Sequence, residues 1–118
     1  MTKFRLTLVT ENQKSIEKGK KFAELICKTL NHKNGYEISK YEKFENSYRI
    51  EISGHIVDKK NSVTESIELT DRICSLWIVT YKRAENNIEL MFNKSDFSNF
   101  LRNEFNVLNW AEFGIENE

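Results

Sequence analysis

The sequence predicts an α+β fold in which two main helices cover one face of an antiparallel sheet of about five to six strands. Two observations predict this class. Segments with apolar residues at every second position alternate with segments that have the helical period. A hydrophobic fraction of 39% and a charged fraction of 31% are typical of a globular protein. The 118 residues contain no Gly/Ser/Pro-rich linker and no repeat, so we expect a single domain over residues 1–118.

The first strand and the first helix are predicted within residues 3–35. Phe4, Leu6 and Leu8 alternate with polar or smaller residues, which is the pattern of a half-buried strand. The segment that follows has one apolar stripe at helical spacing, and Gly35 supplies a residue suited to a left-handed helix stop. The members of this stripe are Ile16, Phe22, Ala23, Ile26, Cys27 and Leu30.

A hairpin and the second helix are predicted next. Residues 36–57 read as two strands around a turn at Glu45-Asn46. Residues 62–75 begin with Ser62 and place Glu65 three positions later, which predicts a capping box at the helix start. The expected buried face of this helix comprises Val63, Ile67, Thr70 and Cys74, flanked by Leu69 and Ile73.

Residues 76–93 predict two more strands around Glu85-Asn86-Asn87. The expected core positions are Leu76, Ile78, Ile88, Leu90 and Phe92. The opposite side of the first of these strands carries Trp77, Val79 and Tyr81, so this strand is either covered on both sides or presents an aromatic patch.

A short third helix and a last strand complete the predicted order. In residues 94–105, Ser95 is a candidate cap, and four apolar residues follow at helical spacing. They are Phe97, Phe100, Leu101 and Phe105. In the tail, residues 106–118, Ala111, Phe113 and Ile115 alternate with Trp110 and Glu112. The first six elements match the β-α-β-β-α-β core of ferredoxin-like folds.

Charge and composition bear on the compartment and on the partner. Eighteen basic and eighteen acidic residues leave no net charge, which disfavours a protein whose main work is to hold a phosphate backbone. Residues 1–10 alternate in polarity instead of forming the apolar run of a signal peptide, and no run is long enough to span a membrane. Cys27 and Cys74 lie in apolar segments and are expected as buried thiols, a disulfide being the less favoured alternative. We therefore expect a cytoplasmic protein.

No stretch indicates catalysis, a cofactor or a metal, so we expect a protein that is not an enzyme. Neither His32 nor His55 has a ligand at metal-binding spacing, and the helical pattern assigns Cys27 to packing. His32 is expected to complement the end of the first helix. The glycines are scattered, so no Gly-rich loop can hold a phosphate.

The two predicted helices carry opposite charges on their outer sides. Four lysines, Lys14, Lys18, Lys21 and Lys28, follow one stripe of the first helix. Glu65, Glu68 and Asp71 repeat at three-residue spacing on the second helix, where a solvated row is favoured over a catalytic pair. The two stripes either screen each other or form two poles that orient a charged protein partner.

The ending Trp110-Ala111-Glu112-Phe113 of a short, proline-free α+β chain resembles the small immunity proteins of bacterial contact-dependent growth inhibition and related polymorphic toxin systems. The resemblance implies a cytosolic protein that binds a cognate toxin domain and blocks its active site or substrate groove. Nucleases are among the candidate toxin domains. An inhibitor needs aromatic anchors and complementary charge more than catalytic groups. The candidate partner-binding residues are Glu65, Glu68, Asp71, Trp77, Tyr81, Trp110, Glu112 and Glu116.

Two alternatives remain at this point. The first is a module that binds RNA or single-stranded nucleic acid on an aromatic sheet face, with Tyr48, Trp77 and Tyr81 as stacking platforms and the lysine stripe on phosphates. The second is a small-ligand or metabolic enzyme with a pocket between sheet and helices, which would require a deep cavity with converging polar groups.

Overall fold

The computed structural model describes residues 2–30, 35–56 and 61–117. It contains two α-helices, α1 (Ile16–Thr29) and α2 (Ser62–Asp71), and two short 3-10 helices, Arg83–Glu85 and Asn103–Val107. The strands are β1 (Thr2–Thr10), β2 (Tyr36–Lys40), β3 (Tyr48–His55), β4 (Cys74–Ser75), β5 (Ile78–Lys82), β6 (Asn87–Asn93), β7 (Asn99–Phe100) and β8 (Leu108–Asn117). The α+β class is confirmed.

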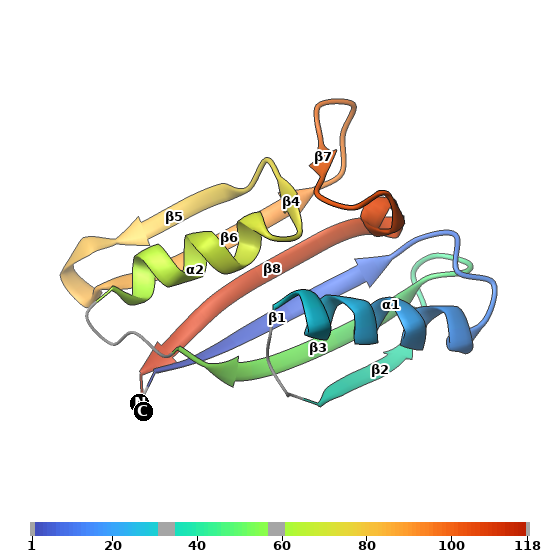
Figure 1. Ribbon diagram of the computed structural model, residues 1–118, viewed down its shortest axis with the longest axis horizontal. Helices are drawn as coiled ribbons and strands as arrows, with labels where there is room; N and C mark the ends of the chain where they lie inside the picture. Colours follow the sequence, from blue (N-terminus) through green and yellow to red (C-terminus); the bar gives the residue numbers. More distant parts are fainter. Residues whose placement is uncertain (1, 31–34, 57–60, 118) are drawn as a thin grey trace.

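Six strands form one antiparallel sheet in the order β2-β3-β1-β8-β6-β5 (Figure 1). The order β2-β3-β1 is that of a ferredoxin-like fold, but the ferredoxin-like prediction is wrong beyond it. The place beside β1, which that layout gives to the first strand after the second helix, is taken by the tail strand β8. The strand after α2 is β4, which has two residues and pairs with β7 in a separate ribbon.

The tail fits beside β1 because their apolar residues share the same face. Leu6 pairs with Phe113 and Leu8 with Ala111, while Phe4 pairs with Ile115. All are buried. Ten residues of β8 therefore lie between β1 and β6, in the middle of the sheet. The prediction of a final strand with Ala111, Phe113 and Ile115 facing the core is confirmed.

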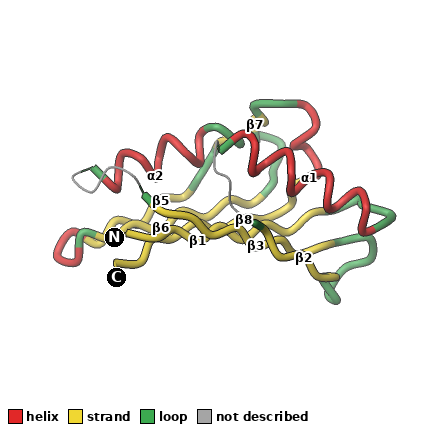
Figure 2. Tube along the Cα trace, turned by 60° about the horizontal axis from the view of Figure 1, so that its bottom comes forward, coloured by secondary structure: helices red, strands yellow, loops and turns green. Residues whose placement is uncertain are grey.

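Both helices lie on one side of the sheet, as Figure 2 shows from the edge. Between them, the 3-10 helix Asn103–Val107 inserts Phe105, whose ring meets the ring of Phe22 edge-on at 6.2 Å. A guanidinium nitrogen of Arg72, just after α2, donates to the carbonyl of Leu30, just after α1, at 3.3 Å. These contacts connect α1 to the 3-10 helix and to the end of α2, above the middle of the sheet.

Helix α1 packs closely over β2 and β3 because it carries a glycine where it crosses them. A Cβ on Gly19 would come within 2.7 Å of Cδ1 of Ile38. The helix ends at Thr29, and its C-cap is Leu30 in the right-handed conformation. The prediction that Gly35 stops this helix is therefore wrong. His32, predicted to complement the helix end, lies outside the described residues.

Helix α2 buries most of the predicted face, but it ends at Asp71, so the buried Ile73 and Cys74 lie beyond it. Its cap is Asn61, so the capping box predicted from Ser62 is wrong. Leu69 and Thr70 are buried as predicted, and Ser66 is buried as well, whereas the prediction of Ile67 as a buried residue is wrong because its side chain is exposed. The hydroxyls of Ser66 and Thr70 donate to the carbonyls four residues earlier at 2.7 and 3.0 Å. Because these hydroxyls are hydrogen-bonded to the helix backbone, the small polar side chains can face the sheet without leaving an unpaired polar group. Apolar periodicity alone cannot detect such buried polar positions.

Residues 94–105 do not form the predicted third helix. Ser95 caps a turn instead, its hydroxyl accepting from the amide of Phe97 at 3.2 Å, and β7 follows. Phe105 is buried and Phe100 is half-buried, but Phe97 and Leu101 are exposed. The four apolar residues do not share a face. The ring of Phe100 packs against Phe92 of β6, whereas Phe97 and Leu101 point outward.

The hairpin of β5 and β6 turns at Asn86, which has a positive φ of 48°, as predicted around Glu85-Asn86-Asn87. Ile88, Leu90 and Phe92 of β6 are buried as expected. The prediction of Leu76 and Ile78 as core residues is wrong, since both are about two thirds exposed at 65% and 64%. β5 is the outermost strand, and no described residue of it is buried.

Among the described residues, no helix is both long and apolar enough to cross a lipid bilayer.

Candidate functional site

Among the described residues, no helix covers the face of the sheet opposite α1 and α2, and we call this face the open face (Figure 2). The pairing register assigns the side chains that share it. Arg5, Thr7 and Val9 of β1 lie beside Gly114, Glu112 and Trp110 of β8. On the far sides, Glu51 of β3 pairs with Thr7, and Glu89 of β6 pairs with Gly114. The centre of this face is therefore charged, and one end of it is aromatic.

A cavity of about 290 Å³, here called the acidic hollow, lies at the centre of the open face. Four carboxylates and two guanidinium groups line it, those of Glu51, Glu89, Glu112, Glu116, Arg5 and Arg49. Its floor includes Gly114, and a Cβ built on that residue meets no atom within 4 Å. The missing side chain leaves this part of the hollow open.

The hollow carries an excess of negative charge. Arg49 and Glu51 form an ion pair at 2.6 Å. Within residues 2–30, 35–56 and 61–117, no ion pair joins Glu89, Glu112 or Glu116 to a basic group of the chain. Arg5 lies between β3 and β8, so its charge is set against carboxylates on both neighbouring strands. A cationic group entering the hollow would meet carboxylates that the fold leaves available.

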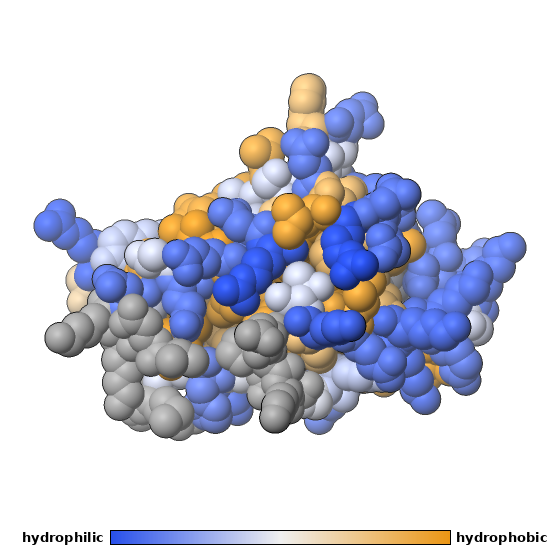
Figure 3. Space-filling view, viewed as in Figure 1, coloured by the Kyte–Doolittle hydropathy of each residue, from blue (hydrophilic) through white to orange (hydrophobic). Residues whose placement is uncertain are grey.

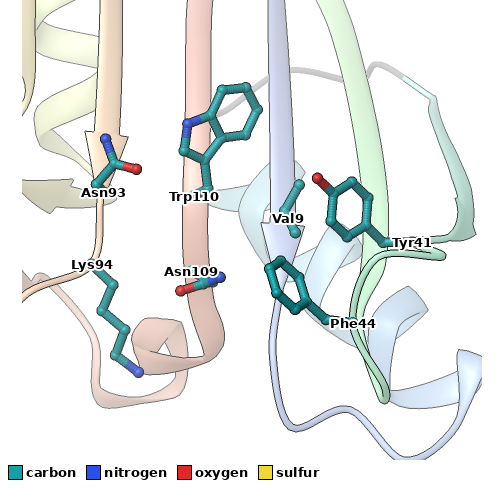
Figure 4. A pocket seen from close by; sticks show the side chains of 7 residues that line it. All are labelled: Val9, Tyr41, Phe44, Asn93, Lys94, Asn109 and Trp110. Atoms are coloured by element: carbon teal, nitrogen blue, oxygen red, sulfur yellow. The ribbon is translucent and has the colours of Figure 1, made fainter.

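An aromatic cleft of about 320 Å³ adjoins the hollow at the end of the open face (Figure 4). Trp110 forms one wall, and Tyr41 and Phe44 from the loop between β2 and β3 form the other. The rings of Tyr41 and Phe44 lie 5.9 Å apart, and the floor is the buried Val9. Phe44 remains 55% exposed, so this cleft offers aromatic surface to a ligand.

Lys94 borders the cleft but does not aim its charge into it. Its ammonium donates to Glu11 and, at 2.5 Å, to the carbonyl of Asn106. Figure 4 shows the side chain of Lys94 extending away from Trp110. Among the described residues, the side-chain amides of Asn93 and Asn109 have no hydrogen bond within the chain. The polar groups available to a ligand here are therefore neutral.

The structure divides the eight predicted partner-binding residues between two sides of the sheet. Trp110, Glu112 and Glu116 gather on the open face. Glu65, Glu68 and Asp71 belong to α2, in the helix layer on the other side. No single flat surface holds both groups.

Trp77 and Tyr81 differ in how available they are. The indole N–H of Trp77 donates to the carbonyl of Cys74 at 2.8 Å, and its ring lies 5.6 Å from that of Phe92. Trp77 is half-buried on the helix side and stabilises the fold there. Tyr81 is 49% exposed, and its hydroxyl donates to Asn86 Oδ1 at 3.2 Å. The strand of residues 78–82 thus presents a patch and is not covered on both sides.

Sequence reasoning missed several residues of the open face. Arg5, Glu51 and Glu89 had the right signal, since each alternates with buried residues of its strand. Their convergence depends on the strand order, which places β8 between β1 and β6. Tyr41 and Phe44 lie in a loop and carry no periodic signal.

The described residues show no arrangement for metal or thiol chemistry. They contain no group of three His, Cys, Asp or Glu side chains placed to hold a metal ion. Cys27 and Cys74 are buried free thiols. Burial, and then the nearby Asp71, raise the pKa of Cys74 from 9.0 to about 12, while burial and Glu24 raise the pKa of Cys27. Both thiols are held protonated, the unreactive form.

Comparison of the chain with protein-family models, with curated proteins and with solved structures gives no significant match.

Proposed function

We propose that this protein binds a basic surface of another protein through its open face, and that it neutralises a cognate toxin domain as an immunity-type inhibitor. One observation carries the proposal: an acidic hollow lies directly beside an aromatic cleft on the sheet face opposite the two described helices. The resemblance of the tail to immunity proteins supports the finer part, because Trp110 of that tail lines the cleft and Glu112 and Glu116 line the hollow.

The two cavities supply the two things that a specific protein interface needs. Large aromatic side chains in a cleft act as anchors that contribute most of the binding free energy. Charged groups beside these anchors steer the encounter and reject partners of the wrong sign. In the hollow, the carboxylates attract lysine and arginine side chains of the partner. Arg5 requires an acidic or neutral group of the partner opposite it. This mixed pattern selects one basic surface more narrowly than a uniformly acidic face would.

Nucleic acid is a weaker candidate for the same face. The carboxylates of the hollow would repel a phosphate backbone. The predicted stacking residues do not come together on it, because Tyr48 lies under α1 near Gly19 while Trp77 lies on the helix side. The lysine stripe of α1 also lies on the side of the sheet away from Trp110.

The test is a binding experiment with two matched charge-reversal variants. Glu89→Lys/Glu112→Lys/Glu116→Lys alters the open face, and Glu65→Lys/Glu68→Lys/Asp71→Lys alters α2 by the same charge. We expect a toxin domain encoded next to this chain to bind the wild type and the α2 variant, and to lose at least about tenfold in affinity for the open-face variant.

Growth of cells that express the toxin domain provides the functional readout. Wild type and the α2 variant should restore growth, and the open-face variant should not. If the α2 variant alone loses binding and protection, the open face is not the interface and the acidic helix is. If no adjacent toxin domain binds the wild type at all, the immunity function is wrong.

A further inference from the structure

Strand β5 forms an outer edge of the sheet and is exposed along all five of its residues. Its apolar side chains project from both faces. The register places Ile78 beside Met91 on the open face, whereas Val79 and Tyr81 lie beside the buried Leu90 and Ile88 on the helix side. Figure 3 shows, from the helix side, hydrophobic residues gathered along the upper border, where Figure 1 has β4, β5 and β7.

The opposite edge of the sheet is protected, and β5 is not. β2 carries Glu37 and Lys40, and the loop after it continues with Glu42 and Lys43, all exposed. Charges of this kind prevent one sheet edge from pairing with another. β5 has one charged residue, Lys82 at its end, and its middle three residues are Val79, Thr80 and Tyr81. An edge strand of this composition is a template for another strand.

We propose that β5 pairs with β5 of a second copy of this chain, antiparallel, about a twofold axis at Thr80. In this register Val79 lies opposite Tyr81 of the second copy, and Tyr81 lies opposite its Val79. A β-branched residue beside an aromatic one is a favourable cross-strand pair, and the symmetry makes it twice. Both side chains are 49% exposed in the single chain.

The distribution of charge favours a second copy in this register. The two Lys82 residues stand at opposite ends of the ladder, about 13 Å apart along the strands, which exceeds the Debye length of about 8 Å. Each lies opposite Ile78 of the other copy, which is 64% exposed, and the alkyl stem of a lysine covers such a residue. No like charges face each other in this ladder.

The twofold axis is perpendicular to the sheet, so the helices of both copies lie on one side and both open faces lie on the other. We infer the dimer from the free edge of β5, independently of the proposed binding function. Its consequence for that function is that two acidic hollows and two aromatic clefts face the same way.

The charge test uses Thr80, which is exposed and should lie against itself in the dimer. Thr80→Lys and Thr80→Glu each place like charges at the axis, and each should weaken the dimer at least about tenfold in sedimentation over a roughly hundredfold range of protein concentration. An equal mixture of the two variants should form heterodimers. Ser39→Lys, on the opposite edge strand, is the matched control and should dimerise as the wild type does.

Disulfide trapping tests the register. In antiparallel strands, directly opposed Cα atoms lie about 4.5 to 5.5 Å apart, within the range of a disulfide. Thr80→Cys should form a covalent dimer under mild oxidation, and Ser39→Cys should not, while the native thiols are buried and do not compete. Thermal unfolding of each variant confirms that the monomer is folded.

The proposal is overturned if the wild type sediments as a monomer throughout, or if Thr80→Cys and Ser39→Cys cross-link equally. A monomeric wild type whose Thr80→Lys variant loses a foreign partner instead would assign the edge to a strand of that partner. Loss of dimerisation with retained binding of a toxin domain to the open face would separate this outcome from the proposed function.

Discussion

Phe4 and Phe113 stack face to face, with their ring centroids 5.3 Å apart and their planes 15° from parallel. The two residues belong to β1 and β8, the first and last strands of the chain. They are diagonal neighbours across the central strand pair, since Leu6 pairs with Phe113 and Phe4 with Ile115. This stack links the two ends of the sequence at the middle of the sheet, so the tail stabilises the whole fold.

We expect Phe113→Ala to lower the free energy of unfolding by about 3–5 kcal/mol, because it leaves a cavity at a site that is 1% exposed and removes the stack on Phe4. Urea unfolding followed by circular dichroism measures this change. Glu112→Ala, on the neighbouring residue that points to the open face, is the control and should change stability by less than about 0.5 kcal/mol. Equal effects of the two substitutions would contradict the assignment of faces in β8.

The tail strand was predictable because alternation identifies a strand and its core face without any knowledge of its neighbours. Its place between β1 and β6 was not, because ladder partners are chosen among all strands of matching length and pattern. The prediction of a third helix was wrong for a related reason. Phe97 and Phe100 have helical spacing, but the hydroxyl of Ser95 bonds two residues on and closes a turn, which competes with a helix.

The candidate site shows the same limit. Trp110 and Glu112 were predicted on one face because a single strand fixes their side, and Glu116 continues that alternation in the structure. Arg5 and Glu89 join them only through the strand order. The acidic row of α2 and the aromatic residues Trp77 and Tyr81 were grouped with them by residue type alone, and the sheet separates them from the open face.

A substitution at Gly114 should affect stability and partner binding in opposite directions. Its φ is not positive, and a Cβ there meets no atom within 4 Å, so a branched side chain fits the strand. We expect Gly114→Val to raise the free energy of unfolding by about 0.5–1 kcal/mol, since glycine weakens a strand interior. The same side chain fills the floor of the acidic hollow and should lower partner affinity at least about tenfold.

Ser39→Val is the control for this experiment, because Ser39 lies on the same side of the sheet, on β2, and does not line the hollow. Calorimetric titration with the toxin domain measures affinity, and urea unfolding measures stability. A Gly114→Val variant that is stabilised and still binds with wild-type affinity would place the interface elsewhere.

Trp110 is the expected anchor of the aromatic cleft. Removing its wall with Trp110→Ala should weaken partner binding by about 2 kcal/mol or more, which is the effect of losing a large aromatic anchor. Phe44→Ala on the opposite wall should have a similar effect at little cost to the fold, because Phe44 lies in an exposed loop. Tyr81→Ala, an aromatic truncation on β5, is the matched control. If Tyr81→Ala weakens binding and Phe44→Ala does not, the partner contacts the edge strand and not the cleft.

Cys74 makes the stability of the fold sensitive to high pH. Its pKa is raised from 9.0 to about 12 by burial and then by Asp71, so the folded state disfavours the thiolate. The unfolded chain releases this proton above pH 9.0, whereas the folded chain keeps it up to about pH 12. The stabilisation is therefore complete below pH 9.0 and is lost as the pH rises toward 12, with a slope of up to about 1.4 kcal/mol per pH unit. Urea unfolding at a series of pH values from neutral upward measures this slope. Cys74→Ala starts from a lower stability because it leaves a small cavity, but its curve should be flatter above pH 9.0. Parallel curves for wild type and Cys74→Ala would show that other groups cause the alkaline loss of stability.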